Sequence, residues 1–224
     1  IKYGTDNMAK GPAMSREEAI KAIEVGIDTV ADLKEKGYNV FATGEMGIGN
    51  TTTSSAVCSV LLDQSVEKVT GKGAGLTNKD LEHKIEVIKQ SIALNQVDAK
   101  DPLDVLSKVG GLDIAGMVGC YIGGAALQVP VFIDGFISSV AALIAIRLVP
   151  ECAPYLFPSH CSNEPAGHMI LDAIGKQPYI LANMCLGEGT GAVMGFTIAD
   201  YAFKAYWELP SFEQTNFGTY EELN

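Results

Sequence analysis

Three glycine-rich clusters constrain what this 224-residue chain can form, because each follows an expected strand or precedes an expected helix. They span residues 44–53 (GEMGIGNTTT), 69–75 (VTGKGAG) and 186–192 (LGEGTGA). In α/β proteins, ligands bind where strands end and helices begin, and glycines there let backbone N–H groups face an anion. The first cluster has neither the GKS/T ending of a Walker loop nor the spacing GxGxxG. It is a candidate phosphate-binding turn, and a tight turn without a ligand is the alternative.

Helical and strand patterns alternate along the chain. We expect helices at residues 15–37, 51–62, 77–95, 101–110, 136–148, 167–174 and 190–207, and strands at 39–43, 129–133, 155–157 and 179–186. The first helix carries the clearest start signal, a capping box of Ser15 and Glu18. Strands that alternate with helices indicate an α/β domain with a mainly parallel sheet.

Residues 114–133 carry no charge over twenty positions and superficially read as a membrane span. The stretch contains four glycines, a glutamine and a proline, and Asp134 follows it directly. We therefore expect a buried helix that leads into a buried strand, and no association with a membrane.

The charge balance excludes several classes of partner. Sixteen Lys and Arg stand against 27 Asp and Glu, a net charge of −11, whereas nucleic acids and anionic membranes require a basic surface. The five cysteines show no CxxC spacing, which is typical of reduced thiols in a cytosolic protein. We expect a cytoplasmic globular protein without metal or cofactor. A dinucleotide-binding oxidoreductase is disfavoured, because the sequence lacks a GxGxxG motif after a strand with an acidic residue about 20 positions later.

Four polar features could carry chemistry. Glu188 lies at the junction of an apolar strand and helix, where partial desolvation would raise the pKa of a general base; an exposed loop glutamate is the alternative. Asp134 follows a strand and could hold ribose hydroxyls or N-cap the 136–148 helix. Lys72 could contact an anion or lie in a mobile loop. In residues 159–168, the spacing of His160, Cys161 and His168 favours neither a metal site nor a nucleophile pair.

Six runs in this order resemble one family. They are GEMGIGNTTTSSA (44–56), VTGKGAGL (69–76), GGLDIAGMVG (110–119), VPVFIDGFISSVAALIA (129–145), PSHCSNEPAGH (158–168) and LGEGTGA (186–192). The chain thus resembles, from about residue 4 to beyond residue 190, the nicotinate-nucleotide:dimethylbenzimidazole phosphoribosyltransferases of cobalamin lower-ligand assembly.

The resemblance implies a reaction and a set of site residues. The 5-phosphoribosyl group of nicotinate mononucleotide would pass to a nitrogen of 5,6-dimethylbenzimidazole, with inversion, to give α-ribazole 5′-phosphate and nicotinate. Glu188 would be the base that removes the benzimidazole proton. Substrate-binding residues are expected at Glu45, Gly47, Gly49, Gly73, Lys84, Asp134, Gly135 and Ser162. Helical spacing alone places Lys84 on a solvated face.

The resemblance also implies a domain organisation. We expect an N-terminal helical segment (1–38), a Rossmann-like phosphoribosyl-binding domain (39–195) with helices flanking its sheet, and a C-terminal helix and tail (196–224) that contribute to a small helical domain. Family members carry an additional N-terminal portion that helps build this small domain, the aromatic-base pocket and a homodimer, and we expect such a segment to precede Ile1. A relative that uses phenolic acceptors and an inactive partner subunit of an active paralogue are the alternatives.

Overall fold

Parallel strands form the centre of the protein, whose computed structural model describes residues 1–47 and 49–215. In one sheet β1 (Phe41–Ala42) pairs with β2 (Val131–Ile133), which pairs with β3 (Leu156–Pro158); in the other β4 (His160–Ser162) pairs with β5 (Ile180–Met184). Every pairing is parallel, which confirms the expected α/β class. Ser159 links the sheets, because its N–H donates to the Ile133 carbonyl and its carbonyl accepts from the Ile180 N–H.

Helices surround the strands and agree closely with the expected ranges. They are α1 (Arg16–Glu35), α2 (Asn50–Leu62), α3 (Val66–Val69), α4 (Asn78–Leu94), α5 (Pro102–Val109), α6 (Leu112–Ala126), α7 (Phe136–Leu148), the 3₁₀ helix η1 (Pro150–Tyr155), α8 (Gly167–Ala173) and α9 (Thr190–Glu208). The Ser15 and Glu18 capping box starts α1, and Thr77 and Asp101 accept backbone N–H groups at the starts of α4 and α5.

Three short elements do not follow from the sequence pattern. They are α3, η1 and β4. The first is four residues long, and η1 contains two prolines, Pro150 and Pro154. The residues of β4, His-Cys-Ser, lack the apolar alternation that marks a strand, so only the pairing with β5 reveals it.

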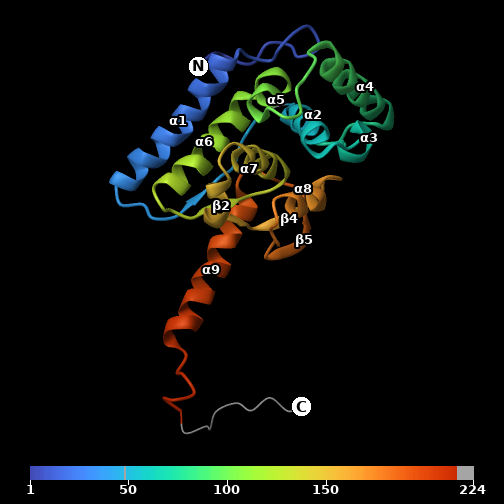
Figure 1. The fold of residues 1–224 in the computed structure, drawn as a ribbon. Coiled ribbons are helices and arrows are strands. Elements are labelled where there is room, and N and C mark those ends of the chain that lie inside the picture. The colour runs from blue at the N-terminus through green and yellow to red at the C-terminus, as the bar shows by residue number, and fades with distance from the viewer. Residues whose placement is uncertain (48, 216–224) are drawn as a thin grey trace.

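The uncharged stretch 114–133 forms most of α6 and all of β2, and its core-facing residues are buried, as expected. Helix α7 lies at the centre of the molecule, where residues 138–145 are all buried (Figure 1). Within residues 1–47 and 49–215, no helix combines the length and the apolar character needed to cross a membrane.

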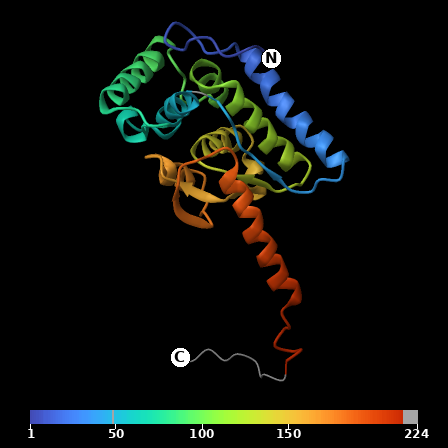
Figure 2. The same ribbon diagram turned by 180° about the vertical axis from the view of Figure 1, so that it is seen from behind.

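Helices α1 and α6 lie side by side along one flank of the molecule (Figures 1 and 2). Their contact depends on glycines, since a Cβ on Gly119 would clash with the Ile23 carbonyl oxygen and lie 2.9 Å from the Gly26 Cα. Such a clash with backbone atoms cannot be relieved by a change of side-chain rotamer.

We expect Gly119→Ala to lower the free energy of unfolding by about 1–3 kcal/mol through overpacking, although alanine is the better helix former. Gly116 lies on the same helix with open space around its Cα, so Gly116→Ala should instead stabilise the protein by about 0.5–1 kcal/mol. Chemical denaturation of both variants tests this, and equal stability of the two would show that helix packing does not depend on Gly119.

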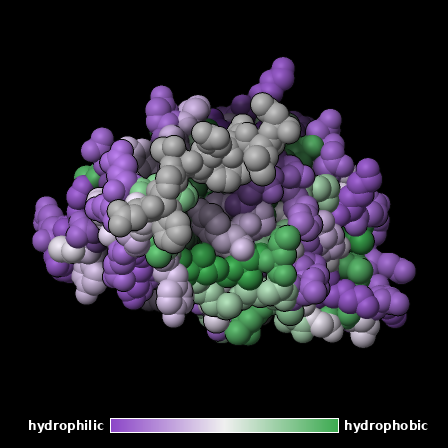
Figure 3. Space-filling model, turned by 90° about the horizontal axis from the view of Figure 1, so that it is seen from below, coloured by the Kyte–Doolittle hydropathy of each residue, from purple (hydrophilic) through white to green (hydrophobic). Residues whose placement is uncertain are grey.

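Helix α9 points away from the rest of the protein (Figures 1 and 2). Its first turns pack against β2 and β4 through Gly191, Ala192 and Gly195, and Phe196 lies edge-on to Phe132. Residues 200–208 are all exposed. Viewed from the side on which α9 projects, the surface presents a patch of apolar residues (Figure 3).

Candidate active site

The first glycine cluster begins where β1 ends, and buried hydrogen bonds fix that end. The Thr43 N–H donates to the Phe132 carbonyl at 3.0 Å, and its hydroxyl lies 2.7 Å from the Tyr121 hydroxyl. Tyr121 is fully buried. The backbone that carries Gly44 and Glu45 therefore leaves the sheet in a defined direction.

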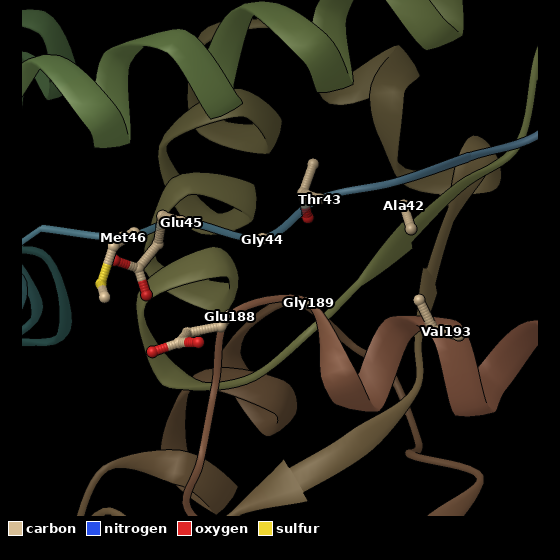
Figure 4. A pocket seen from close by; sticks show the side chains of 8 residues that line it. All are labelled: Ala42, Thr43, Gly44, Glu45, Met46, Glu188, Gly189 and Val193. Atoms are coloured by element: carbon tan, nitrogen blue, oxygen red, sulfur yellow. The ribbon is translucent and has the colours of Figure 1, made fainter.

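The first and third glycine clusters touch through their backbones. A Cβ on Gly44 would lie 2.6 Å from the Cα of Gly189 and 2.9 Å from the carbonyl carbon of Glu188. Glu45 and Glu188 consequently line one open cavity of about 410 Å³ (Figure 4). The cavity residues are Ala42, Thr43, Gly44, Glu45, Met46, Glu188, Gly189 and Val193.

We expect Gly44→Ala to separate these two loops, because the added methyl group would meet only backbone atoms. Overpacking of this kind costs about 1–3 kcal/mol, and a displacement of about 1 Å between reacting groups can lower turnover about 10²-fold. Thermal unfolding and turnover should therefore both fall. Gly11→Ala is the control, since Gly11 has open space around it, and equal turnover of the two variants would contradict the prediction.

Glu45, rather than Glu188, is the desolvated carboxylate of the cavity. Burial raises the pKa of Glu45, the nearby charges of Asp113, Asp134 and Glu188 act in the same direction, and a hydrogen bond from Asn50 opposes them. The Asn50 amide donates to both Glu45 and Asp113. Glu188 is exposed in this structure, so the expected partial burial of this residue is wrong. The reason is that Glu188 lies in a turn closed by the Thr190 N–H and the Gly187 carbonyl, on the surface and ahead of the buried Gly191 and Ala192.

The second glycine cluster surrounds Lys84 of α4. Its ammonium group donates to the Thr51 hydroxyl at 2.9 Å and to the Gly71 carbonyl at 3.1 Å, and Lys84 is only 7% exposed. The placement on a solvated face is therefore wrong, because α4 packs against α2. Burial lowers the pKa of Lys84, and the negative charge of Glu164 opposes that shift. Lys72, the lysine inside the cluster, is exposed.

Glu164 joins the second cluster to β4. Its pKa is raised by burial, and both the charge of Lys84 and a hydrogen bond from the Gly73 backbone oppose that rise. The Glu164 N–H donates to the Ser162 hydroxyl at 3.3 Å, and Ser162 lies against Gly135. His160 is buried beside Gly135, whereas His168 is exposed. In the described part of the chain, no group of three or more His, Cys, Asp or Glu is arranged to hold a metal ion.

Asp134 closes the site from the tip of β2. Its carboxylate accepts backbone N–H groups from Gly189 at 3.1 Å, Gly191 at 2.8 Å and Ala192 at 3.2 Å. It thus caps α9, not the helix that follows it in sequence; α7 begins after Gly135 without a side-chain cap. The alternative of an N-cap for residues 136–148 is therefore wrong.

The nine residues expected at the site fall into three neighbouring groups. Glu45 and Glu188 line the cavity, with Gly47 and Gly49 in the loop that follows Glu45. Lys84 and Gly73 lie at Thr51. Ser162, Gly135 and Asp134 form the third group, from which Asp134 accepts the Gly189 N–H. Asn50 and Glu164 connect these groups, although neither is among the residues predicted from the sequence. Both lie inside the runs GEMGIGNTTTSSA and PSHCSNEPAGH, and that position is the signal that could have found them.

A family model described as "Phosphoribosyltransferase" matches residues 1–217. The chain belongs to this phosphoribosyltransferase family. It is 54% identical over 223 residues to a protein of Ruminiclostridium cellulolyticum and 52% identical over 221 residues to one of Acetivibrio thermocellus. Both are named nicotinate-nucleotide–dimethylbenzimidazole phosphoribosyltransferase. The matches cover 100% and 99% of this chain but 63% of each relative, so the chain spans less than two thirds of their length.

A solved structure of this family has the same fold. The crystal structure of CobT from Thermus thermophilus superimposes with a TM-score of 0.90 at 32% sequence identity. The match covers 96% of this chain and 64% of that one. The resemblance drawn from the six sequence runs is thereby confirmed at the level of family and fold.

Proposed function

We propose that the protein transfers the 5-phosphoribosyl group of nicotinate mononucleotide to a nitrogen of 5,6-dimethylbenzimidazole. The products are α-ribazole 5′-phosphate and nicotinate. The observation that carries this proposal is a cavity that the first and third glycine clusters line with Glu45 and Glu188, next to the loop in which Lys84 contacts Thr51 and the second cluster. The chain also shares about half its residues with relatives of that name.

The phosphate of the substrate binds between α2 and the second glycine cluster. The first turn of α2 has no side-chain cap, so its positive dipole end is open to an anion, although the Asn50 and Thr52 N–H groups already donate to the Gly47 and Gly49 carbonyls. Lys84 supplies the positive charge beside Thr51. The start of α9 cannot serve in this way, because Asp134 already accepts its N–H groups.

The transfer exchanges one C–N bond for another at the anomeric carbon. The bond to the nicotinate nitrogen breaks, and its electron pair stays with that nitrogen, which loses its positive charge. A benzimidazole nitrogen attacks from the opposite face, and the proton on the other ring nitrogen passes to the carboxylate of Glu188. The half-buried Glu45 faces the same cavity and places negative charge where the anomeric carbon becomes cationic.

The assembly and location follow from the same proposal. We infer a cytoplasmic homodimer, with residues 196–224 part of a small helical domain that completes the aromatic-base pocket. The apolar residues exposed along α9, among them Tyr201, Phe203 and Trp207, support a packed environment for this helix. The division at residues 38 and 195 stays a prediction.

A product assay tests the reaction. The protein at its natural length is mixed with nicotinate mononucleotide and, in separate reactions, with dimethylbenzimidazole, adenine, phenol or p-cresol, and chromatography follows nicotinate release and the new riboside. We expect product with the benzimidazole. Product only with phenols would assign the protein to the phenol-activating relatives, and no product with any acceptor would favour an inactive partner subunit.

A further inference from the structure

The turn that carries Glu188 has an unfavourable backbone conformation. Gly187, Glu188 and Gly189 all have positive φ, at 75°, 57° and 81°. Glycine adopts this region freely, but a residue with a Cβ does not. A conformation of this kind persists when surrounding contacts determine it, and such residues gather at functional sites. The surroundings must therefore hold Glu188 in place.

Asp134 supplies the contacts immediately after this turn. It is 3% exposed, and it accepts N–H groups from Gly189, Gly191 and Ala192. These N–H groups belong to the start of α9, where a helix provides no partner of its own. The positive end of the helix dipole also stabilises a carboxylate at this position. Asp134 thus fixes the residue directly after Glu188 and the helix that follows.

The neighbours of Asp134 leave its carboxylate free for this task. The Ser159 hydroxyl lies 2.7 Å from the Ile133 carbonyl, 3.2 Å from the Asp134 carbonyl and 3.2 Å from His160 Nδ1, so it bonds the backbone and the imidazole and not the Asp134 carboxylate. Burial holds the pKa of His160 below its usual range, although the charge of Asp134 opposes that shift. His160 Nδ1 lies 4.0 Å from the Asp134 carboxylate, beyond hydrogen-bond distance.

We propose that Asp134 is a positioning residue for Glu188: by accepting the three N–H groups, its carboxylate holds the strained turn that directs Glu188 into the cavity. This inference rests on the proposed function, and it assigns Asp134 a role through the loop instead of a direct contact with ribose hydroxyls.

A double-mutant cycle tests the inference in the protein at its natural length. Asp134→Asn should lower kcat about 10- to 100-fold, the size of effect that a displaced catalytic group produces, and change KM for nicotinate mononucleotide less than about threefold. If Asp134 acts through Glu188, adding Asp134→Asn to the Glu188→Gln variant should lower kcat by less than about a further threefold. Losses that multiply, or a raised KM with unchanged kcat, would overturn the proposal.

Hydrogen exchange provides a second measurement that needs no activity. The Gly189, Gly191 and Ala192 amides should be protected in the wild-type protein and exchange at least about tenfold faster in Asp134→Asn. Fast exchange in the wild-type protein would overturn the proposal even if the variant does not fold. An inactive wild type with protected amides would instead count against the proposed reaction alone.

Asp101→Asn is the matched control. Asp101 accepts the N–H groups of Leu103 and Asp104 at the start of α5 and does not line the cavity. Its substitution also alters a helix-capping aspartate, but kcat, KM and the exchange of the α9 amides should not change. A fall in kcat equal to that of Asp134→Asn would show that a general loss of stability explains both.

Discussion

Replacement of Glu188 by glutamine should lower turnover by about 10²- to 10⁴-fold, the range expected for the loss of a general base. Glutamine preserves the size of the side chain and removes only its ability to take a proton. Because Glu188 lies on an exposed turn with Gly187 and Gly189, the substitution should leave stability unchanged. Single-turnover kinetics and calorimetry with nicotinate mononucleotide separate the chemical step from binding, and we expect binding to survive.

The second carboxylate of the cavity provides the comparison. Glu45→Gln should lower turnover less than Glu188→Gln does, because Glu45 stabilises charge without accepting the proton in the proposed reaction. A larger loss in Glu45→Gln would transfer the role of base to Glu45, whose pKa burial already raises. Turnover close to wild type in Glu188→Gln would remove Glu188 from the chemistry.

Lys84→Ala should weaken the binding of nicotinate mononucleotide by about 1–3 kcal/mol, or about 5- to 150-fold in Kd. The ammonium group lies between Thr51 and Gly71, where the substrate phosphate is proposed to bind. Its removal also leaves Glu164 without a nearby positive charge, which adds negative potential to the site. Titration calorimetry measures the change directly.

Lys79→Ala is the control for this measurement. Lys79 lies on the same helix, is exposed, and carries the same charge. If the effect of Lys84 came from the overall charge of the protein, both substitutions would weaken binding equally. Unchanged affinity in Lys84→Ala would exclude Lys84 from the phosphate site.

Local signals predicted most of the fold. Helix starts at Ser15, Thr77 and Asp101 follow from capping residues that act within three positions of themselves. The strand β4 could not be predicted in this way, because its polar residues become a strand only through pairing with β5. The break between β3 and β4 at Ser159 has the same origin in tertiary contacts.

The sequence predicts which residues form the site, but not the environments that the structure gives them. The glycine clusters and family runs predict Glu45, Lys84 and Glu188 as site residues; the structure places Glu45 and Glu188 at one cavity and Lys84 at Thr51, and their roles stay predictions. Burial of Lys84 and exposure of Glu188 depend on how α4 and the last glycine cluster pack, which periodicity does not report. The link from Asp134 to α9 spans more than 50 residues of sequence.

The position of Asp134 makes the start of α9 a pivot. At a rise of about 1.5 Å per residue, the 19 residues of this helix extend about 28 Å, so a tilt of about 5° would move the far end by about 2.4 Å. Glu188, about two residues from the pivot, would move by only a few tenths of an ångström. A movement of the exposed end of α9 would therefore displace the Glu188 carboxylate far less, and the loop that carries Glu188 is mechanically insulated from whatever contacts that end.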